Sequence, residues 1–284
     1  MVRPEWRGRL CLSDLIGGPP QARDATQPAL ASELYFMFSA DPDFTTEHIL
    51  PLFREDPTAN LAWNPYLHYP RYDDKLLAAG FLDGVFAEWD RLPDLGQSGL
   101  QRQFFGLTAS IVSFAGITQA QRQELLNKSV LADSGAHAVD FAESVVRLIS
   151  TDKIDGAELW NRWLREHLTA RLNGLPRNPG PEELARWADA VPYLGSSLGE
   201  ALGLLSGRDI GFGERFRVPV FPEGVLETSG PALAQHYAER IRNSVPGNHF
   251  CGYQVKRLVE TLNDIPGGVS AAELALAANN SGFI

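Results

Sequence analysis

The chain has 284 residues, of which 44% are hydrophobic and 21% are charged, and its formal net charge at pH 7 is -10. This composition is that of a folded globular protein rather than a disordered one, and the length suits one large domain or two small ones. An acidic chain is a poor ligand for nucleic acid, because phosphate neutralisation requires clustered Lys and Arg. We therefore expect no nucleic-acid partner for the chain as a whole.

The sequence contains no export, membrane or disulfide signal that we recognise. The two cysteines, Cys11 and Cys251, lie near opposite ends and predict neither a disulfide framework nor a paired-cysteine metal site. The apolar stretch 10–16 is interrupted by an acid and is too short for a signal peptide. The most apolar run, 104–117, is shorter than the ~18 residues of a spanning helix. We expect a cytoplasmic protein with no membrane span.

Helical spacing dominates the chain after its first 28 residues. The segment 1–28 is rich in Gly, Pro, Arg and Gln without periodicity, and we expect a loosely ordered lead segment there. From residue 29 onward, apolar residues recur at spacings of three and four, which is typical of amphipathic helices. The spacing is clearest in 82–89, 100–114 and 138–148. The sequence therefore predicts one helical domain over 29–284, which could divide near 174–181, where Gly and Pro cluster.

Local signals also place several helix ends. Asp41 before Pro42 fits an N-cap residue followed by proline at the first helical position. Asp155 is the predicted N-cap of a later helix, and Gly174 is the predicted left-handed residue at the end of that helix. Leu175 is placed for the apolar contact that accompanies a Schellman ending.

The predicted fold class is all-α. Many similar helices without intervening strands favour an irregular α-solenoid, which is a helical-repeat array of the HEAT or armadillo kind. No strict repeat period is evident, so a compact irregular bundle is the alternative. At most one short β element is expected, near 212–221, where apolar and polar residues alternate. Pro219 restricts that element to an edge strand, and an extended loop fits equally well.

The run 158–176 holds two polar residues inside an apolar stripe. On a helical wheel, Trp160 begins a stripe of leucines at every fourth residue, flanked by Trp163, and His167 and Arg171 fall within it. In the favoured interpretation, Arg171 lies on a tryptophan face near the helix C-terminus and His167 is hydrogen-bonded at the rim of a packed interface. In the other interpretation, these residues form part of a partner-binding groove.

Tryptophan and tyrosine also crowd the run 63–72. Such side chains bury a ring and keep a polar tip available, so they suit both helix junctions and binding surfaces. We favour a packed junction. If the chain binds a partner through residues of these two runs, the candidates are Trp160, Trp163, His167, Arg171, Trp63 and Tyr66.

No coherent catalytic or cofactor motif is present. The Gly-Lys-Ser/Thr sequence of a P-loop does not occur. The run 195–199 has the Gly-x-Ser-x-Gly spacing of a nucleophile elbow, which suggests a serine hydrolase that uses Ser197 with His167 or His236. That elbow requires a strand before the serine, and none is predicted. A helix N-cap at Ser196 or Ser197 is therefore the favoured interpretation.

Metal ligation is also not expected. None of the six histidines has the His-x-x-x-His spacing that places two rings on one helical face. His236, His249 and Cys251 could approach one another as three ligands, but a loop histidine beside a buried thiol is the favoured interpretation.

Several stretches together carry a resemblance to a known family. They are Trp160-x-x-Trp163-Leu164, Arg171-x-x-Gly174-x-Pro176, Glu182-Glu183, Trp187, and Leu34-Tyr35-Phe36-Met37-Phe38 leading into Asp41-Pro42-Asp43 and Leu50-Pro51-Leu52-Phe53. Over roughly residues 29 to 280 the chain resembles the bacterial domain of unknown function numbered 4020. Members of that family commonly lie C-terminal to a sirtuin-like domain in proteins associated with defence against phage. The resemblance implies that an NAD-consuming activity belongs to a separate or missing domain, and it assigns no catalytic residue here.

Taken with this resemblance, the sequence predicts a non-enzymatic helical interaction or regulatory module. It would be an accessory or sensor part of a bacterial defence system with a sirtuin-like effector. The expected partner is a protein, such as that effector or a phage protein, and no cofactor is expected. The alternatives are a serine hydrolase that uses Ser197, and a nucleic-acid-binding helical module that uses Arg162, Arg165 and Arg171.

Overall fold

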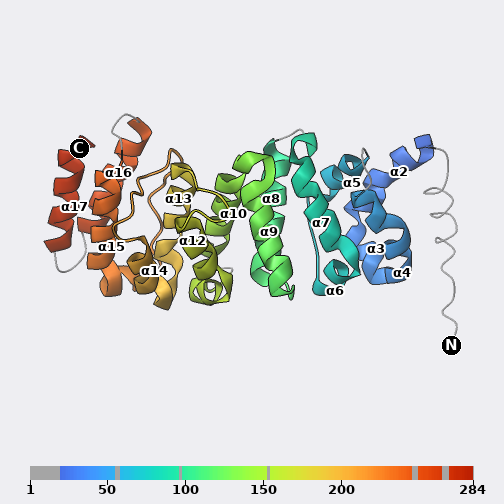
Figure 1. Ribbon diagram of the computed structural model, residues 1–284, viewed down its shortest axis with the longest axis horizontal. Coiled ribbons are helices and arrows are strands. Elements are labelled where there is room, and N and C mark those ends of the chain that lie inside the picture. The colour runs from blue at the N-terminus through green and yellow to red at the C-terminus, as the bar shows by residue number, and fades with distance from the viewer. Residues whose placement is uncertain are drawn as a thin grey trace. The chain divides into compact units, whose positions relative to one another are not determined.

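The protein is all-helical in the part of the chain that its computed structural model describes (Figure 1). That part comprises residues 20–54, 58–95, 98–151, 154–244, 249–263 and 269–283. The chain forms two compact units, Met1–Gly135 and Ala136–Ile284, which we call unit 1 and unit 2 and describe separately. Their boundary lies well before 174–181, the place where the sequence suggested a division.

Unit 1 consists of α-helices interrupted by short π- and 3-10-helical turns. Helix α2 begins at Pro20, inside the segment 1–28 that we expected to be loosely ordered, and it packs along α5. The α-helices are α2 (Pro20–Ser32), α3 (Leu34–Ala40), α4 (Pro42–Phe44), α5 (Ala59–Tyr66), α6 (Asp74–Leu76), α7 (Leu82–Glu88), α8 (Ser98–Phe114) and α9 (Gln119–Leu131). The turns are η1 (Thr45–Ile49), η2 (Leu50–Phe53), η3 (Leu77–Phe81), η4 (Trp89–Leu95) and η5 (Ala132–Gly135).

The core of unit 1 is a cluster of aromatic rings in edge-to-face contact. Trp63 lies against Phe53, with ring centroids 5.0 Å apart, and its indole Nε1 donates to the Phe53 carbonyl oxygen at 3.0 Å. The Tyr66 hydroxyl donates to the Arg71 carbonyl oxygen at 2.7 Å. These two bonds give both polar tips an internal partner. The favoured prediction for the run 63–72, a packed junction, is therefore confirmed for Trp63 and Tyr66.

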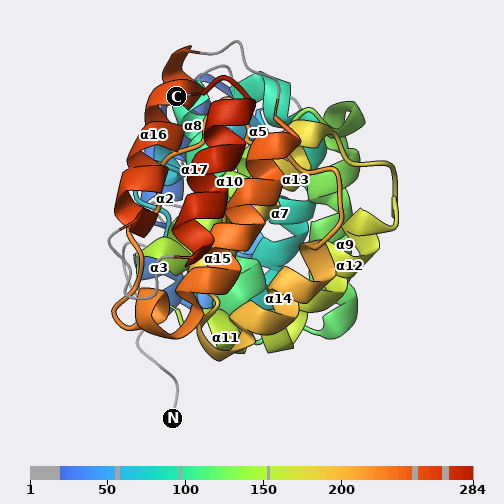
Figure 2. The same ribbon diagram turned by 90° about the vertical axis from the view of Figure 1, so that its left-hand side faces the viewer.

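Unit 2 continues with helices and one long irregular segment. Helix α10 packs along α13, and α15 lies beside α17 (Figure 2). The described residues of 212–221 form no strand, so the extended loop is the correct alternative there. The elements are α10 (Ala138–Ser150), α11 (Gly156–Leu159), η6 (Trp160–Leu164), α12 (Arg165–Leu172), α13 (Pro181–Ala188), η7 (Val191–Tyr193), η8 (Gly195–Ser197), α14 (Leu198–Leu205), α15 (Val225–Arg242), α16 (His249–Asn263) and α17 (Val269–Asn280).

The predicted helix ends are present. The Asp155 carboxylate accepts from the Ala157 amide at 2.9 Å and caps α11. At the end of α12, Gly174 has a φ of 76°, and the amide of Leu175 donates to the carbonyl of Ala170 at 2.9 Å, as in a Schellman ending. Leu175 is 59% exposed, so hydrogen bonds define this ending rather than the apolar contact that we predicted. Asp41 likewise accepts from the Phe44 amide, with Pro42 at the first helical position.

Two glycines of unit 2 test how closely the segments of this unit pack. A Cβ atom at Gly156 would overlap the carbonyl oxygen of Tyr193, whereas a Cβ at Gly203, inside α14, would meet nothing within 4 Å. We expect Gly156→Ala to lower the free energy of unfolding by about 1–3 kcal/mol, as overpacking does. Gly203→Ala should raise it by about 0.5–1 kcal/mol, because alanine is the better helix former. Urea unfolding measures both, and equal effects would contradict the close approach at Gly156.

Candidate functional site

The six residues that the sequence offered as partner-binding candidates are all buried. Trp160, Trp63 and Arg171 are fully buried, and none of the six is more than 5% exposed. A side chain with so little surface cannot meet a partner while the protein stays folded. The burial supports the packing interpretation of both runs, and a binding surface must be sought elsewhere.

His167 is part of the aromatic core of unit 2. Its ring lies 5.8 Å from Trp163 and 5.1 Å from Trp187, in edge-to-face contact with both. Its Nε2 is buried and has no hydrogen-bond partner among the described residues, so the predicted hydrogen bond at the rim of an interface is wrong. Burial, followed by the charge of Arg171, lowers the pKa of His167 to about 3. The ring is therefore neutral in the folded protein at pH 7.

Arg171 is held by a carboxylate, where the sequence had suggested a tryptophan face. Its Nε and Nη2 donate to the two carboxylate oxygens of Glu183 at 2.5 and 2.9 Å. Its Nη1 donates to the carbonyl oxygens of Leu175 and Arg177 at 2.5 and 2.7 Å. The guanidinium thereby joins the end of α12, the turn that follows it and the first turn of α13.

The structure gives no support to a serine nucleophile at Ser197. The serine lies in the 3-10 turn η8, which follows the 3-10 turn η7 rather than a strand, and it is 7% exposed. Ser197 is the N-cap residue of α14, as favoured, although its side chain makes no capping bond. The Nε2 atoms of His167 and His236 are both buried without a partner among the described residues, so neither ring activates the serine through that atom.

The arginines proposed for nucleic-acid binding are each engaged inside unit 2. Arg162 pairs with Glu158 one helical turn away, and Arg165 pairs with Glu200 at 3.3 Å. Arg171 is fully buried. These three side chains therefore do not form a free basic surface.

A shallow groove of about 640 Å³ lies between α12 and α14. At its base the Trp160 indole Nε1 donates to the Glu200 carboxylate at 2.8 Å. That carboxylate also pairs with Arg165. Trp160 thus fixes α14 against the preceding helical segment, which is a structural role.

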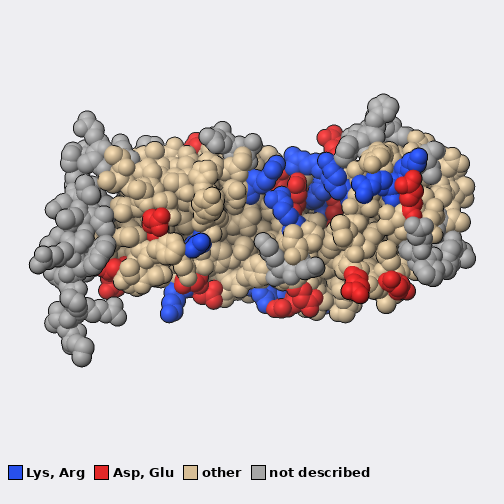
Figure 3. Space-filling model, turned by 180° about the vertical axis from the view of Figure 1, so that it is seen from behind, with Lys and Arg blue, Asp and Glu red and all other residues tan. Residues whose placement is uncertain are grey.

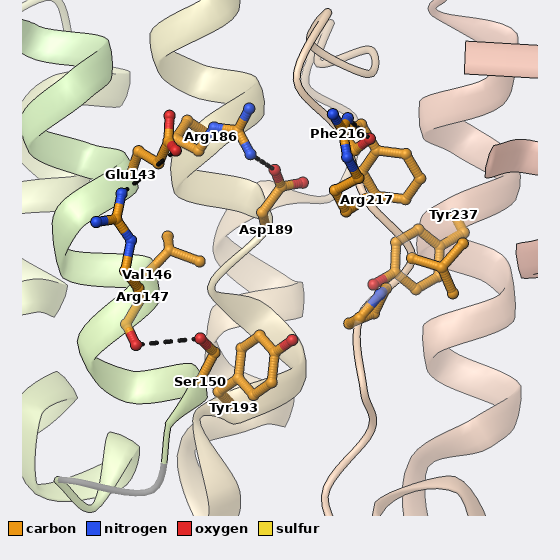
Figure 4. Close-up of a pocket in the computed structure, with 12 residues that line it drawn as sticks. Glu143, Val146, Arg147, Ser150, Arg186, Asp189, Tyr193, Phe216, Arg217 and Tyr237 are labelled. Atoms are coloured by element: carbon orange, nitrogen blue, oxygen red, sulfur yellow. Dashed lines mark hydrogen bonds and ion pairs between the residues drawn. The ribbon is translucent and has the colours of Figure 1, made fainter. Parts of the chain in front are cut away.

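A second, smaller cavity of about 200 Å³ lies among α10, α13, α15 and the irregular segment 211–221 (Figure 4). We call it the arginine cavity. Its charged side chains are Arg147, Arg186, Arg217, Glu143 and Asp189. The remaining lining residues are Val146, Ser150, Tyr193, Phe216, Val218, Pro219 and Tyr237.

Hydrogen bonds from the surrounding helices fix the irregular segment that forms one wall of this cavity. At Gly211 a Cβ atom would approach the Asn243 carbonyl oxygen to 2.9 Å, so the chain can pass this close to α15 only without a side chain. Three backbone amides of the segment donate to side chains: Phe212 to Ser244 Oγ at 2.8 Å, Glu214 to the Glu182 carboxylate at 3.0 Å, and Val218 to Gln254 Oε1 at 3.1 Å. The wall is therefore held at residues 212, 214 and 218.

A buried ionic network lies at one end of the cavity. Asp189 accepts from Arg186 at 2.8 Å through one carboxylate oxygen and from Arg240 at 2.9 Å through the other. Arg240 is 1% exposed, also donates to the carbonyl oxygens of Ala185 and Gly211, and lies 4.6 Å over the ring of Phe212. The network connects α13, α15 and the irregular segment.

Positive charge exceeds negative charge around the cavity. Glu143 pairs with Arg147 at 3.4 Å and with Arg215 at 3.1 Å. Burial tends to raise the pKa of Glu143, but the hydrogen bond from Arg215 and the charges of Arg186, Arg215 and Arg147 outweigh burial and lower it. Lys and Arg side chains gather over this part of unit 2 (Figure 3). The cavity lining and its ion-pair partners bring together five arginines (147, 186, 215, 217 and 240) and three carboxylates (140, 143 and 189).

One donor in this network is left over. Arg186 is 7% exposed, and its Nε is buried with no hydrogen-bond partner among the described residues. In Figure 4 the guanidinium groups of Arg186 and Arg217 lie on either side of Asp189 at the same end of the cavity. An unsatisfied donor on a buried cation is costly.

The arginine cavity was not predicted from the sequence, in which Arg215 and Arg217 are only two of the alternating polar residues of 212–221. A signal was present in α15, where Arg240 falls in register with buried Leu233 and Tyr237, much as Arg171 does in its own stripe. The pairing of Arg240 with Asp189, 51 residues earlier, has no local trace in the sequence.

Comparison with known proteins gives no match: no family model, no curated protein and no solved structure is similar to the chain. No helix among the described residues is long and apolar enough to cross a membrane. The described residues also contain no group of three His, Cys, Asp or Glu side chains that could hold a metal ion. The side chains of His249 and Cys251 lie outside the described residues.

The Arg171–Glu183 pair predicts a strong stability effect. Arg171→Met should lower the free energy of unfolding by about 3–5 kcal/mol, because it leaves the buried Glu183 carboxylate with only the partly exposed Arg177, 3.7 Å away, as a cation. Adding Glu183→Leu should recover part of that loss by removing the stranded charge. The control is Arg162→Met, which breaks an exposed pair and should change stability by about 0–1 kcal/mol. Equal losses for Arg171→Met and Arg162→Met in urea unfolding would show that the buried pair does not matter.

His167 predicts a pH dependence. The unfolded chain takes up a proton at the ordinary histidine pKa of 6.5, whereas the folded ring stays neutral down to a pKa of about 3. Stability should therefore fall as the pH drops below 6.5, by about 1.4 kcal/mol per pH unit for each such histidine. His236, whose pKa burial and then Arg240 also lower to about 3, contributes the same slope.

The variant His167→Phe keeps an aromatic ring between Trp163 and Trp187 and removes the titrating group. The loss of stability between pH 7 and pH 5 should be smaller in this variant than in the wild type, with the contribution of His236 remaining. His68→Gln, at an exposed position, is the control and should leave the pH dependence unchanged. Urea unfolding at the two pH values measures the difference, and identical slopes in all three proteins would rule out His167 as the source.

Proposed function

We propose that the protein is a non-enzymatic helical module that binds an acidic partner protein through the arginine face of unit 2. By this face we mean the surface around the arginine cavity, with the exposed side chains of Arg147, Arg215 and Arg217. The observation that carries the proposal is the gathering of these arginines at one cavity in a chain whose formal net charge is -10.

Charge complementarity favours an acidic protein over a nucleic acid. A protein that follows a phosphodiester backbone needs a continuous basic track. On the arginine face the guanidinium groups alternate with carboxylates, since Arg215 pairs with both Asp140 and Glu143. Such a mixed surface suits a partner that presents its own charges at separate points, which is typical of electrostatic complementarity between proteins.

The arrangement of the helices fits a binding role. We propose that they form an irregular helical-repeat array, in which each helix pair buries its apolar face on the next and leaves a long surface for partners. Packed helix pairs such as α10 with α13 and α15 with α17 are in keeping with this arrangement. The resemblance to the domain of unknown function 4020 suggests a sirtuin-like effector or a phage protein as the acidic partner, with the chain as a sensor or accessory part.

A serine hydrolase is the weaker candidate. No strand precedes Ser197. The Nε2 atoms of His167 and His236 have no hydrogen-bond partner among the described residues, so neither atom is bonded to the serine. No other observation favours catalysis at this position.

The test of the proposal uses a short, fluorescently labelled polyglutamate peptide as an acidic probe. We expect the wild type to bind this peptide and not to bind an uncharged Gly-Ser peptide of the same length. The double variant Arg215→Gln with Arg217→Gln should bind about tenfold more weakly, equivalent to roughly 1.4 kcal/mol, because the lost cations face the probe. Fluorescence anisotropy at low and moderate salt gives the affinities.

The control is Arg208→Gln with Arg242→Gln, which removes the same charge from two exposed positions outside the cavity lining. It should bind the peptide like the wild type. Equal weakening by both double variants would mean that only net charge matters, and the proposal would fail. Preferential binding of a duplex DNA oligonucleotide, lost in the Arg215/Arg217 variant, would overturn it in favour of a nucleic-acid interface.

A further inference from the structure

We propose that the arginine cavity is a binding site for a phosphate dianion, carried either by a small phosphorylated molecule or by a phosphorylated side chain of the partner. This inference rests on the proposed interaction function and specifies the chemical group that the arginine face recognises. Its basis is the combination of a cavity, an excess of fixed positive charge and a buried guanidinium with an unsatisfied donor.

The site is built from rigid parts. Arg186 is more than nine-tenths buried and donates to Asp189 through Nη1. Its Nε has no hydrogen-bond partner among the described residues. Arg147 is braced by Glu143 on the same helix, and the main chain around Arg217 is fixed by the bond from the Val218 amide to Gln254. Guanidinium groups that are already held in place lose little side-chain entropy when an anion binds, which favours affinity.

The charge of the site favours an anion. The cavity lining holds three arginines, Arg147, Arg186 and Arg217, against two carboxylates, Glu143 and Asp189, and Asp189 also pairs with the buried Arg240. A phosphate monoester carries about -1.5 to -2 at pH 7, and guanidinium groups bind its oxygens through strong charge-assisted hydrogen bonds.

The size and the directions of the donors also point to a phosphate. A volume of about 200 Å³ lies below the 300 Å³ or so of the smallest sites for drug-sized ligands, so the cavity suits a compact group rather than a whole nucleotide. Donors come from different elements: Arg147 from α10, Arg186 from α13, Arg217 from the irregular segment and Tyr237 from α15. Figure 4 shows these side chains on several sides of the cavity. Such an arrangement fits a tetrahedral group better than a planar carboxylate.

Tyr237 can serve as a neutral donor in this site. Burial raises the pKa of Tyr237 well above its usual value, although the charge of Arg240 opposes the shift. The hydroxyl therefore keeps its proton at pH 7 and can donate it to a phosphate oxygen.

The experiment is a titration of the full chain with inorganic phosphate. Calorimetry and the shift in Tm both measure the binding. Chloride at matched ionic strength is the reference, and succinate is the carboxylate probe. We expect phosphate to bind and to raise the Tm, with succinate at least about tenfold weaker. Arg147→Gln and Arg217→Gln should each weaken phosphate binding by about tenfold, and Tyr237→Phe by several fold. Arg208→Gln should bind phosphate like the wild type.

A second arm separates the two sources of the phosphate. A phosphoserine peptide and its unphosphorylated counterpart compete against inorganic phosphate. Tighter binding of the phosphopeptide than of phosphate assigns the site to a modified partner, whereas equal binding assigns it to a small phosphorylated molecule.

Two outcomes overturn the inference. One is an absence of phosphate binding, and the other is phosphate binding that Arg147→Gln and Arg217→Gln leave unchanged. If the polyglutamate peptide binds through Arg215 and Arg217 while phosphate neither binds nor competes, this inference is wrong and the proposed function stands. If neither polyglutamate nor phosphate binds, both are wrong. The Tm of each variant without ligand, compared with that of the wild type, identifies any loss that comes from unfolding.

Discussion

The arrangement of the groups at one end of the arginine cavity depends on one largely buried carboxylate, Asp189. It lies between Arg186 and Arg240 and accepts a hydrogen bond from each. Burial raises the pKa of Asp189, and the two cations oppose that shift. Removing a buried charge from its partner is far more costly than breaking an exposed pair, since the remaining charge stays desolvated. Because Arg240 also binds the carbonyl oxygen of Gly211, the same carboxylate fixes α13, α15 and the start of the irregular segment relative to one another.

This constraint explains how an acidic protein can hold a local excess of positive charge. Arg186 and Arg240 share the one carboxylate of Asp189, so this pair of cations is only half neutralised, whereas Arg147 and Arg215 have two carboxylates, Glu143 and Asp140. Arg186 and Arg240 cannot turn away into solvent to relieve the imbalance, because both are buried and bonded to Asp189, and Arg240 is also bonded to the carbonyl oxygens of Ala185 and Gly211. The positive potential is thus a fixed property of the fold, and it would act on any anion without a cost of reorganising the site.

The features that the sequence predicted are those that neighbouring residues determine. Asp155 caps its helix through the amide two residues on, and Gly174 ends the next helix through bonds within one turn, so both are visible locally. The site depends instead on partners that are distant in sequence: Arg240 and Asp189 are 51 residues apart, and Val218 and Gln254 are 36 apart. No periodicity encodes such a pairing. The irregular segment adds to the difficulty, because the partners of its backbone amides come from helices whose packing must be known first.

For Arg171, a comparison of interaction energies would have predicted a carboxylate partner from the sequence. Its place within an apolar stripe implied burial, and we assigned it a tryptophan face. A cation–π contact contributes about 0.5–2 kcal/mol, whereas burying an isolated charge costs several kcal/mol even after the protein relaxes. The aromatic face alone could not offset that cost, so a carboxylate had to be near. The closest acids beyond the predicted helix end were Glu182 and Glu183, and Glu183 is the partner that the structure contains. The same comparison applied to Arg240 would have demanded an acid from another helix, which is the first indication that a buried ionic network exists in unit 2.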